Sequence, residues 1–201
     1  MTNTSKKTKV LVEVGMLGAI AAVLMLFEIP LPFIAPPFYE MDFSEVPVLI
    51  GAFALGPMAG ATIELIKILL NLILNGTATA FVGEFANYLI GCSFILPAAL
   101  VYKVRKTKKN ALAGMVLGSL IMTVFGCLMN AYLLLPTYAA AFGMPIDTII
   151  EMGTAVNANI TNIFTFVLIA VAPFNLIKGA VVSLITLLLY KHISPILKGN
   201  R

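Results

Sequence analysis

Residues 42–67 read DFSEVPVLIGAFALGPMAGATIELIK, and this stretch decides the class of the fold. It contains two apolar runs separated at Gly56-Pro57, and the second run encloses a carboxylate and an amine, Glu64 and Lys67. An ionisable side chain within an apolar span is costly in a bilayer and by default marks a functional site. The stretch therefore predicts a membrane protein that works within the membrane.

The composition of the whole chain agrees with this prediction. Of its 201 residues, 60% are hydrophobic and 11% are charged, whereas soluble domains have roughly 45–50% apolar and 25% charged residues. A spanning helix takes about 20 apolar residues, so roughly five to seven spans fit in one helical bundle. The two cysteines, Cys92 and Cys127, lie in apolar runs and are expected to be core thiols.

Six spans account best for the distribution of charge. The apolar runs place them at about residues 10–27, 44–55, 58–74, 84–102, 111–135 and 161–190. Eleven of the 13 lysines and arginines fall in three clusters beside these runs: Lys6, Lys7 and Lys9; Lys103, Arg105, Lys106, Lys108 and Lys109; Lys191, Lys198 and Arg201. With six spans all three clusters share one side, which the positive-inside rule makes cytoplasmic. We therefore predict an all-α polytopic protein of the cell membrane, a single domain with six transmembrane helices and both termini in the cytoplasm.

Polar residues gather near the outer ends of these spans. The segment from Glu28 to Met41 contains four prolines, so it is not helical, and its apolar, aromatic character predicts a lid over a cavity. Counting along the spans brings polar side chains to the same depth: Thr77, Thr79, Glu84, Asn87, Asn130, Asn175 and Lys178. Amides, a carboxylate and an amine beside an apolar lid indicate a pocket for a mostly apolar ligand.

Each of these residues also has a structural interpretation. Glu64 and Lys67, three residues apart, are expected to neutralise each other in the bundle, and Asn130 is equally suited to an interhelical hydrogen bond. Lys178 has no acidic residue within one turn of its own helix, so its partner comes from another helix or from a ligand.

The first span carries two small-residue pairs at four-residue spacing, Gly15/Ala19 and Gly18/Ala22. Such pairs allow another helix to approach closely, either within the bundle or from a partner.

Several function classes are disfavoured. The chain has no G-x-x-x-x-G-K-[ST] nucleotide loop, no H-E-x-x-H, no G-x-S-x-G and no Cys/His metal spacing. A membrane enzyme is therefore not expected, and neither is a metal site. The basic clusters flank spans, so nucleic acid is not an expected partner.

Three segments resemble one family. DFSEVPVLIGAFALGPMAGATIELIK, NGTATAFVGEFANYLIG (75–91) and LPAALVYKVRK (96–106) are similar to the riboflavin-binding S component of energy-coupling factor (ECF) transporters, and the likeness covers nearly the whole chain. The resemblance implies six helices that bind riboflavin from outside, with riboflavin as the transported ligand and no cofactor. It also implies a transmembrane coupling subunit and two cytoplasmic ATPases as partners.

The resemblance also assigns residues. The implied ligand site comprises Phe38, Tyr39, Met41, Phe43, Lys67, Thr77, Ala78, Thr79, Gly83, Glu84, Asn87, Asn130, Asn175 and Lys178. The implied docking face for the coupling subunit comprises Gly15, Gly18, Ala19 and Ala22, where glycine replaces part of the family's A-x-x-x-A pattern. Three other interpretations stay open from the residues alone: an S component for another vitamin, an autonomous ion-coupled transporter, and a membrane enzyme.

Overall fold

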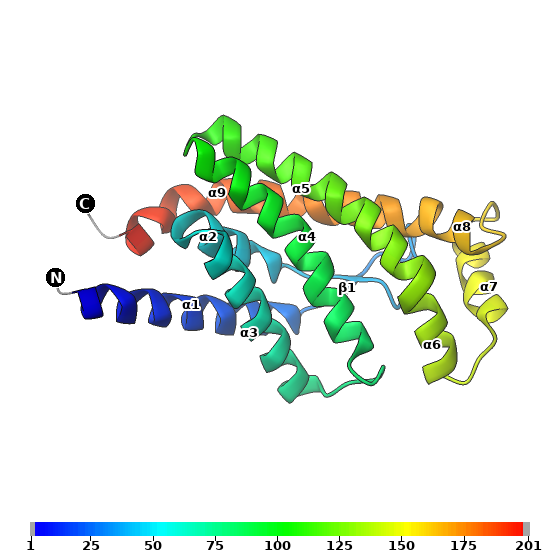
Figure 1. The fold of residues 1–201 in the computed structure, drawn as a ribbon. Helices are drawn as coiled ribbons and strands as arrows, with labels where there is room; N and C mark the ends of the chain where they lie inside the picture. Colours follow the sequence, from blue (N-terminus) through cyan, green and yellow to red (C-terminus); the bar gives the residue numbers. More distant parts are fainter. Residues whose placement is uncertain (1–2, 199–201) are drawn as a thin grey trace.

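A computed structural model describes residues 3–198, which form an elongated bundle of helices (Figure 1). The helices are α1 (Asn3–Met25), α2 (Glu45–Leu55), α3 (Pro57–Asn75), α4 (Val82–Val104), α5 (Lys108–Met129), the π-helical turn η1 (Asn130–Leu134), α6 (Leu135–Ala141), α7 (Ile146–Val156), α8 (Ile163–Phe166), the π-helical turn η2 (Val167–Val171) and α9 (Ala172–Lys198). Arg201 of the third basic cluster lies outside the described residues.

Among the residues that the structure describes, five helical stretches are long and apolar enough to cross a membrane. They are Lys7–Met25, Pro57–Asn75, Val82–Val104, Lys108–Ala141 and Ile163–Lys191. The predicted spans agree with these stretches to within a few residues at most ends. The predicted second span corresponds to α2, whose eleven residues reach only about 16 Å at 1.5 Å per residue.

The fifth stretch corrects one expectation. The fifth span was predicted to end at about residue 135, just before Pro136, yet the helix continues through η1 and α6 to Ala141. Pro136 lies in the first turn of α6, directly after the π-helical turn. Pro173 occupies the same position after η2, near the start of α9. Proline removes a backbone donor and clashes with the preceding turn, and a π-helical turn is one way in which a helix absorbs such a defect.

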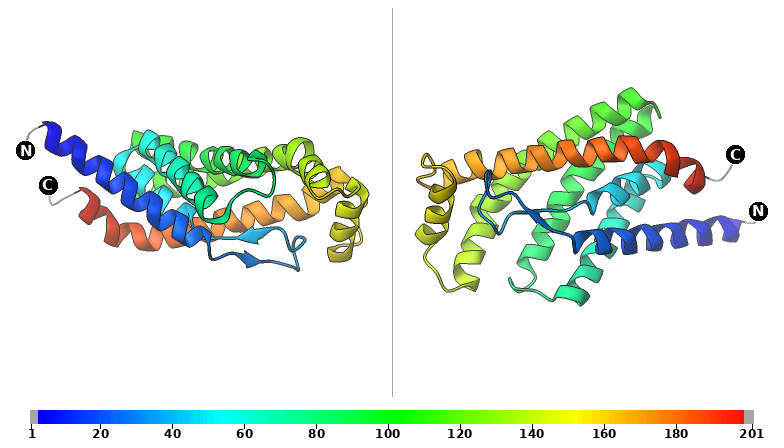
Figure 2. Two further views of the ribbon diagram at one scale, coloured as in Figure 1. Left: turned by 90° about the horizontal axis from the view of Figure 1, so that it is seen from below. Right: turned by 180° about the vertical axis from the view of Figure 1, so that it is seen from behind.

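The segment between α1 and α2 is a short β-hairpin. Strands β1 (Ile29–Pro30) and β2 (Glu40–Met41) pair antiparallel, with Ile29 opposite Met41. The prediction that this proline-rich segment is not helical is confirmed, although the strand pairing was not anticipated. Figure 2 shows the hairpin between the end of α1 and the corner formed by α7 and α8.

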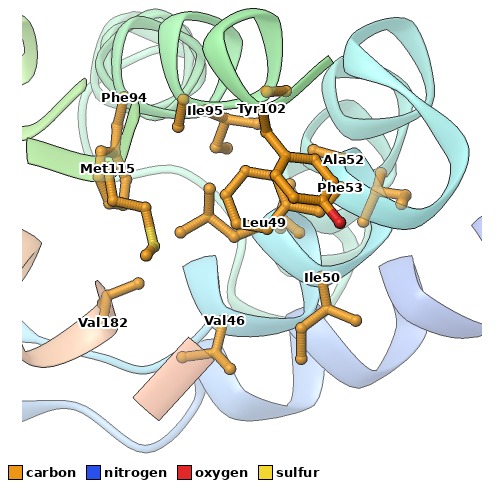
Figure 3. Close-up of a cluster of buried hydrophobic side chains, with 14 of the residues drawn as sticks. Val46, Leu49, Ile50, Ala52, Phe53, Phe94, Ile95, Tyr102, Met115 and Val182 are labelled. Atoms are coloured by element: carbon orange, nitrogen blue, oxygen red, sulfur yellow. The ribbon is translucent and has the colours of Figure 1, made fainter. Parts of the chain in front are cut away.

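Helix α2 lies at the centre of the larger hydrophobic core. Residues 45–53 are all buried, and α2 contacts α1, α3, α4 and α9. In Figure 3, Leu49 and Phe53 of α2 lie close to side chains of α4 such as Ile95 and Tyr102. The helix ends at Gly56, whose φ of +114° favours glycine, and Pro57 starts α3. This Gly-Pro turn brings the acidic start of α2 close to the ionisable residues of α3.

The start of α1, the α4–α5 connection and the end of α9 lie at one end of the bundle (Figure 1). The hairpin, α7 and α8 lie toward the other end. A second hydrophobic cluster there joins Met41, Leu135, Ile149, Phe166 and Phe174.

Candidate ligand-binding site

Two connected cavities lie toward the hairpin end of the bundle. The outer cavity, about 580 Å³, is bounded by the hairpin, the start of α4, α6 and α7. The inner cavity, about 160 Å³, extends further along α4, α5 and α9. Both cavities are lined by the same five residues at their junction: Phe38, Glu40, Gly83, Asn87 and Tyr138.

Ten of the fourteen residues predicted for the ligand site line these cavities. Three of them line the outer cavity alone: Ala78, Thr79 and Glu84. Four line the inner cavity alone: Tyr39, Asn130, Asn175 and Lys178. Phe38, Gly83 and Asn87 line both. Residues far apart in sequence are thus brought to one place by the bundle.

The other four predicted residues lie beside the cavities without lining them. Met41 and Phe43 pack into the hydrophobic cluster under the hairpin. The Thr77 hydroxyl donates a hydrogen bond to Glu84 Oε2 at 3.0 Å, which positions a cavity carboxylate. Lys67 is buried in a group of ion pairs described below.

The two asparagines of the inner cavity are oriented by their own helices. Asn130 Nδ2 donates to the Gly126 carbonyl at 2.8 Å, and Asn175 Nδ2 donates to the Val171 carbonyl at 3.0 Å. Asn130 begins η1 and Val171 ends η2, so both amides are next to a π-helical turn. Since π-helical turns occur frequently at functional sites, these two mark the inner cavity as more than a packing defect.

The hairpin contributes an aromatic wall. The Tyr39 hydroxyl donates a hydrogen bond to Asn130 Oδ1. The Tyr39 ring lies 4.9 Å from that of Phe38 and 5.6 Å from that of Phe174, measured between ring centroids. Burial raises the pKa of Tyr39, so its hydroxyl remains a donor. The predicted lid is therefore connected to the inner cavity by both hydrogen bonding and ring packing.

Lys178 finds its partner on the segment that follows the hairpin. Its Nζ lies 2.9 Å from Asp42 Oδ2, and Asp42 Oδ1 accepts a hydrogen bond from the Ser44 backbone N–H at 2.7 Å. Burial acts to raise the pKa of Asp42, but the ammonium groups of Lys178 and Lys67 outweigh it and hold that pKa well below its usual range. The ion pair ties α9 to the end of the hairpin.

Lys67 lies between two carboxylates. Its Nζ is 2.8 Å from Glu45 Oε1 and 2.7 Å from Glu64 Oε1, and all three side chains are almost fully buried. The predicted Glu64–Lys67 pair is confirmed. The third member, Glu45, was missed as a partner because it lies on another helix. Gly91 leaves room for this group, since a Cβ there would approach Glu64 Oε1 to 2.3 Å.

Sequence reasoning also missed part of the outer cavity wall. Glu28, Tyr138, Phe142, Met144, Ile149 and Met152 line it. Most of these residues follow Pro136, where the sequence predicted that the fifth span had ended. The one available signal was the amphipathic pattern of residues 146–156, which predicts a helix but not the face it covers.

The small residues of α1 divide between two faces. A Cβ on Gly18 would come within 2.5 Å of Ile66 Cγ2, and Ala22 is buried, so this pair is used in packing α1 against α3. Gly15 has open space around its Cα, and Ala19 is exposed. The structure thus leaves the Gly15/Ala19 pair on the free face of the helix.

Long apolar helices enclosing a cavity of amides, an ammonium group and aromatic rings define a membrane-embedded small-molecule-binding protein. A family model described as "ECF transporter, substrate-specific component" matches residues 9–190, and the chain belongs to this family. The family comprises substrate-binding components of transporters, not enzymes.

Similar proteins include curated relatives along almost the full chain. A protein of Staphylococcus aureus (strain TCH60) named "Riboflavin transporter RibU" is 36% identical over 96% of this chain and 94% of its own. A protein of Bacillus subtilis (strain 168) named "Riboflavin transporter FmnP" is 35% identical over 97% of each chain. A solved structure described as the S component of a bacterial ECF transporter aligns with a TM-score of 0.74 at 35% identity, covering 96% of this chain and 99% of that one.

Proposed function

We propose that this chain is the riboflavin-binding S component of an ECF transporter and binds riboflavin from the outer face of the membrane. The observation that carries the proposal is the inner cavity, where Asn130, Asn175 and Lys178 converge beneath an aromatic hairpin. Membership of the S-component family and the riboflavin transporters among its relatives support this ligand.

The chemistry of the inner cavity suits an isoalloxazine ring. The ring is planar with apolar faces, which Phe38, Tyr39 and Phe174 are positioned to cover. Its pyrimidine edge presents carbonyl groups and one N–H, which need amide and ammonium partners, because a buried polar group without one costs about 1–3 kcal/mol. In this proposal the amides of Asn130 and Asn175 meet that edge.

The ribityl chain then extends into the outer cavity. Its hydroxyl groups need small polar partners and accessible backbone, and Ala78, Thr79, Gly83 and Asn87 line the route. The outer and inner cavities share a junction at Gly83 and Asn87, so one ligand of this shape spans both. Riboflavin is the transported ligand in this account, not a cofactor.

We further propose six membrane-spanning segments in one domain, with α2 as the short second span and both termini in the cytoplasm. The start of α1, the α4–α5 connection with its basic cluster and the end of α9 lie together at one end of the bundle (Figure 1). This placement supports the positive-inside orientation, and it directs the hairpin and the outer cavity away from the cytoplasm. The cell membrane is the expected location.

The expected partners are a transmembrane coupling subunit and two cytoplasmic ATPases, as for other S components. Because Gly18 and Ala22 are used against α3, we assign the docking face to Gly15 and Ala19. The exposed apolar side chains Leu11 and Met16 are near them on α1, so the face suits helix-to-helix packing within the membrane.

The test is a titration of the detergent-purified protein with riboflavin, followed by quenching of flavin fluorescence, with other vitamins added as competitors. Saturable quenching that only flavins reverse supports the proposal. Displacement of riboflavin by an unrelated vitamin, or no quenching at all, contradicts it. An Asn130→Ala/Asn175→Ala variant should bind much more weakly, whereas Asn159→Ala, which removes an exposed amide that lines neither cavity, serves as the matched control.

A further inference from the structure

The outer cavity is lined by three carboxylates. Glu28 and Glu40 come from the two arms of the hairpin, and Glu84 comes from the first turn of α4. Among the residues that the structure describes, no lysine or arginine lines this cavity. The cavity through which a ligand would enter therefore carries a negative charge.

Each of the three carboxylates interacts with a neighbouring side chain. Glu84 accepts a hydrogen bond from the Thr77 hydroxyl at 3.0 Å. Burial and a hydrogen bond with Glu40 raise the pKa of Glu28 to about 7. Glu28 is therefore mostly protonated in weakly acidic solution and ionised in weakly basic solution.

The ammonium groups of Lys178 and Lys67 are already paired with carboxylates. Lys178 lies 2.9 Å from Asp42 Oδ2, and Lys67 lies between Glu45 and Glu64. A phosphate group entering the outer cavity would therefore meet carboxylates without a free cation to offset them. Each charge would repel the phosphate, most strongly at low salt, where screening is weak.

From this geometry we propose that Glu28, Glu40 and Glu84 make the site selective for the uncharged flavin and against its 5′-phosphate ester. The inference rests on the proposed function, which places the isoalloxazine ring in the inner cavity and the end of the ribityl chain in the outer one. Riboflavin ends there in a neutral hydroxyl group, whereas the phosphate ester carries a charge of about −1.5 to −2 at pH 7. The two ligands are otherwise the same, so the carboxylates distinguish them by the charge at the 5′ end of the ribityl chain.

The test compares the dissociation constants of the phosphate ester and of riboflavin, measured by fluorescence quenching. In Glu28→Gln/Glu40→Gln the ratio of these constants should fall about threefold to tenfold relative to the wild type at low salt and about pH 8. Glu151→Gln, which removes an exposed carboxylate outside the cavity, should leave the ratio at the wild-type value. A ratio that is the same in all three proteins overturns the proposal.

A second measurement needs no variant. Salt screens charges over about 10 Å at 0.1 M, so the wild-type ratio should fall as the salt concentration rises from about 20 mM to about 500 mM. A ratio that does not change with salt overturns the selectivity by charge. If riboflavin binds but the ratio changes neither in the Glu28→Gln/Glu40→Gln variant nor with salt, this inference fails and the proposed function stands. If neither flavin binds, the proposed function fails as well.

Discussion

Replacing Lys67 by methionine tests the buried ion group directly. Lys67 has 1% of its surface exposed and Glu64 has none, and Lys67 Nζ lies within 2.8 Å of both Glu45 and Glu64. Methionine keeps much of the side-chain volume but removes the ammonium group. Two carboxylates would then remain buried without the cation that separates them.

The expected loss of stability is large. Removing one partner of a buried ion pair costs about 3–5 kcal/mol, because the other charge stays buried and unpaired. For a chain of this length about 1 kcal/mol corresponds to roughly 2–4 °C in Tm. Lys67→Met should therefore lower the Tm by about 6–20 °C.

The chain offers its own reporter for this assay. It has no tryptophan, but Cys92 is a buried free thiol in α4, so a thiol-reactive dye reports unfolding in detergent. The triple variant Glu45→Leu/Lys67→Met/Glu64→Leu removes the charges together and should recover most of the loss, because apolar residues of similar volume are often as stable as a buried ion pair. Lys109→Met, at an exposed lysine, is the control. A Tm for Lys67→Met within about 2 °C of the control would refute the reasoning, because buried unpaired carboxylates should lower the free energy of unfolding by about 3–5 kcal/mol.

The remaining predictions concern the amides, the first helix and the hairpin. Alanine at Asn130 or Asn175 should weaken riboflavin binding at least about tenfold in a fluorescence titration, since each lost hydrogen-bond partner costs about 1–3 kcal/mol; unchanged affinity in both variants would contradict the assignment. Gly18→Val forces a branched side chain against α3 and should lower the Tm, because overpacking costs about 1–3 kcal/mol. Gly15→Val should leave the Tm unchanged, because the space around Gly15 is open. Equal Tm values for the two variants would contradict the assignment of Gly18 to the packed face of α1 and of Gly15 to its free face. The pKa of Glu28 is raised from 4.5 to about 7 by burial and by the neighbouring carboxyl, so the folded state holds this proton more tightly than the unfolded state. Its contribution to stability is complete below about pH 4.5 and is lost as the pH rises through about 7. Between about pH 4.5 and pH 7 the Tm of the wild type should therefore fall more steeply than the Tm of Glu28→Gln. The same dependence of Tm on pH in both proteins would contradict the raised pKa of Glu28.

The long apolar helices were the part of the fold that the sequence predicted best. Long apolar runs bounded by lysines or by Gly-Pro have few alternatives in a bilayer, because every backbone polar group must be bonded within the segment. The error at Pro136 has a definite cause. A proline normally ends a helix, and the π-helical turn that absorbs it at η1 has no signature in hydropathy.

The sequence predicted those residues of the candidate site whose position follows from counting along a membrane-spanning helix. Asn130, Asn175 and Lys178 each lie in a helix whose register the apolar run sets, and all three line the inner cavity. Contacts between segments were beyond this reasoning. The pairing of Glu45 with Lys67 and of Asp42 with Lys178 depends on how the Gly-Pro turn and the hairpin fold back, which spacing along one helix does not reveal.

The central claim is that riboflavin occupies the cavity between the hairpin and the helices. The most direct test is the visible absorption spectrum of the protein purified in detergent from cells grown in rich medium. The account predicts a yellow chromophore that co-purifies, is released on denaturation and is identified as riboflavin. A colourless protein that also fails to quench the fluorescence of added riboflavin would contradict it.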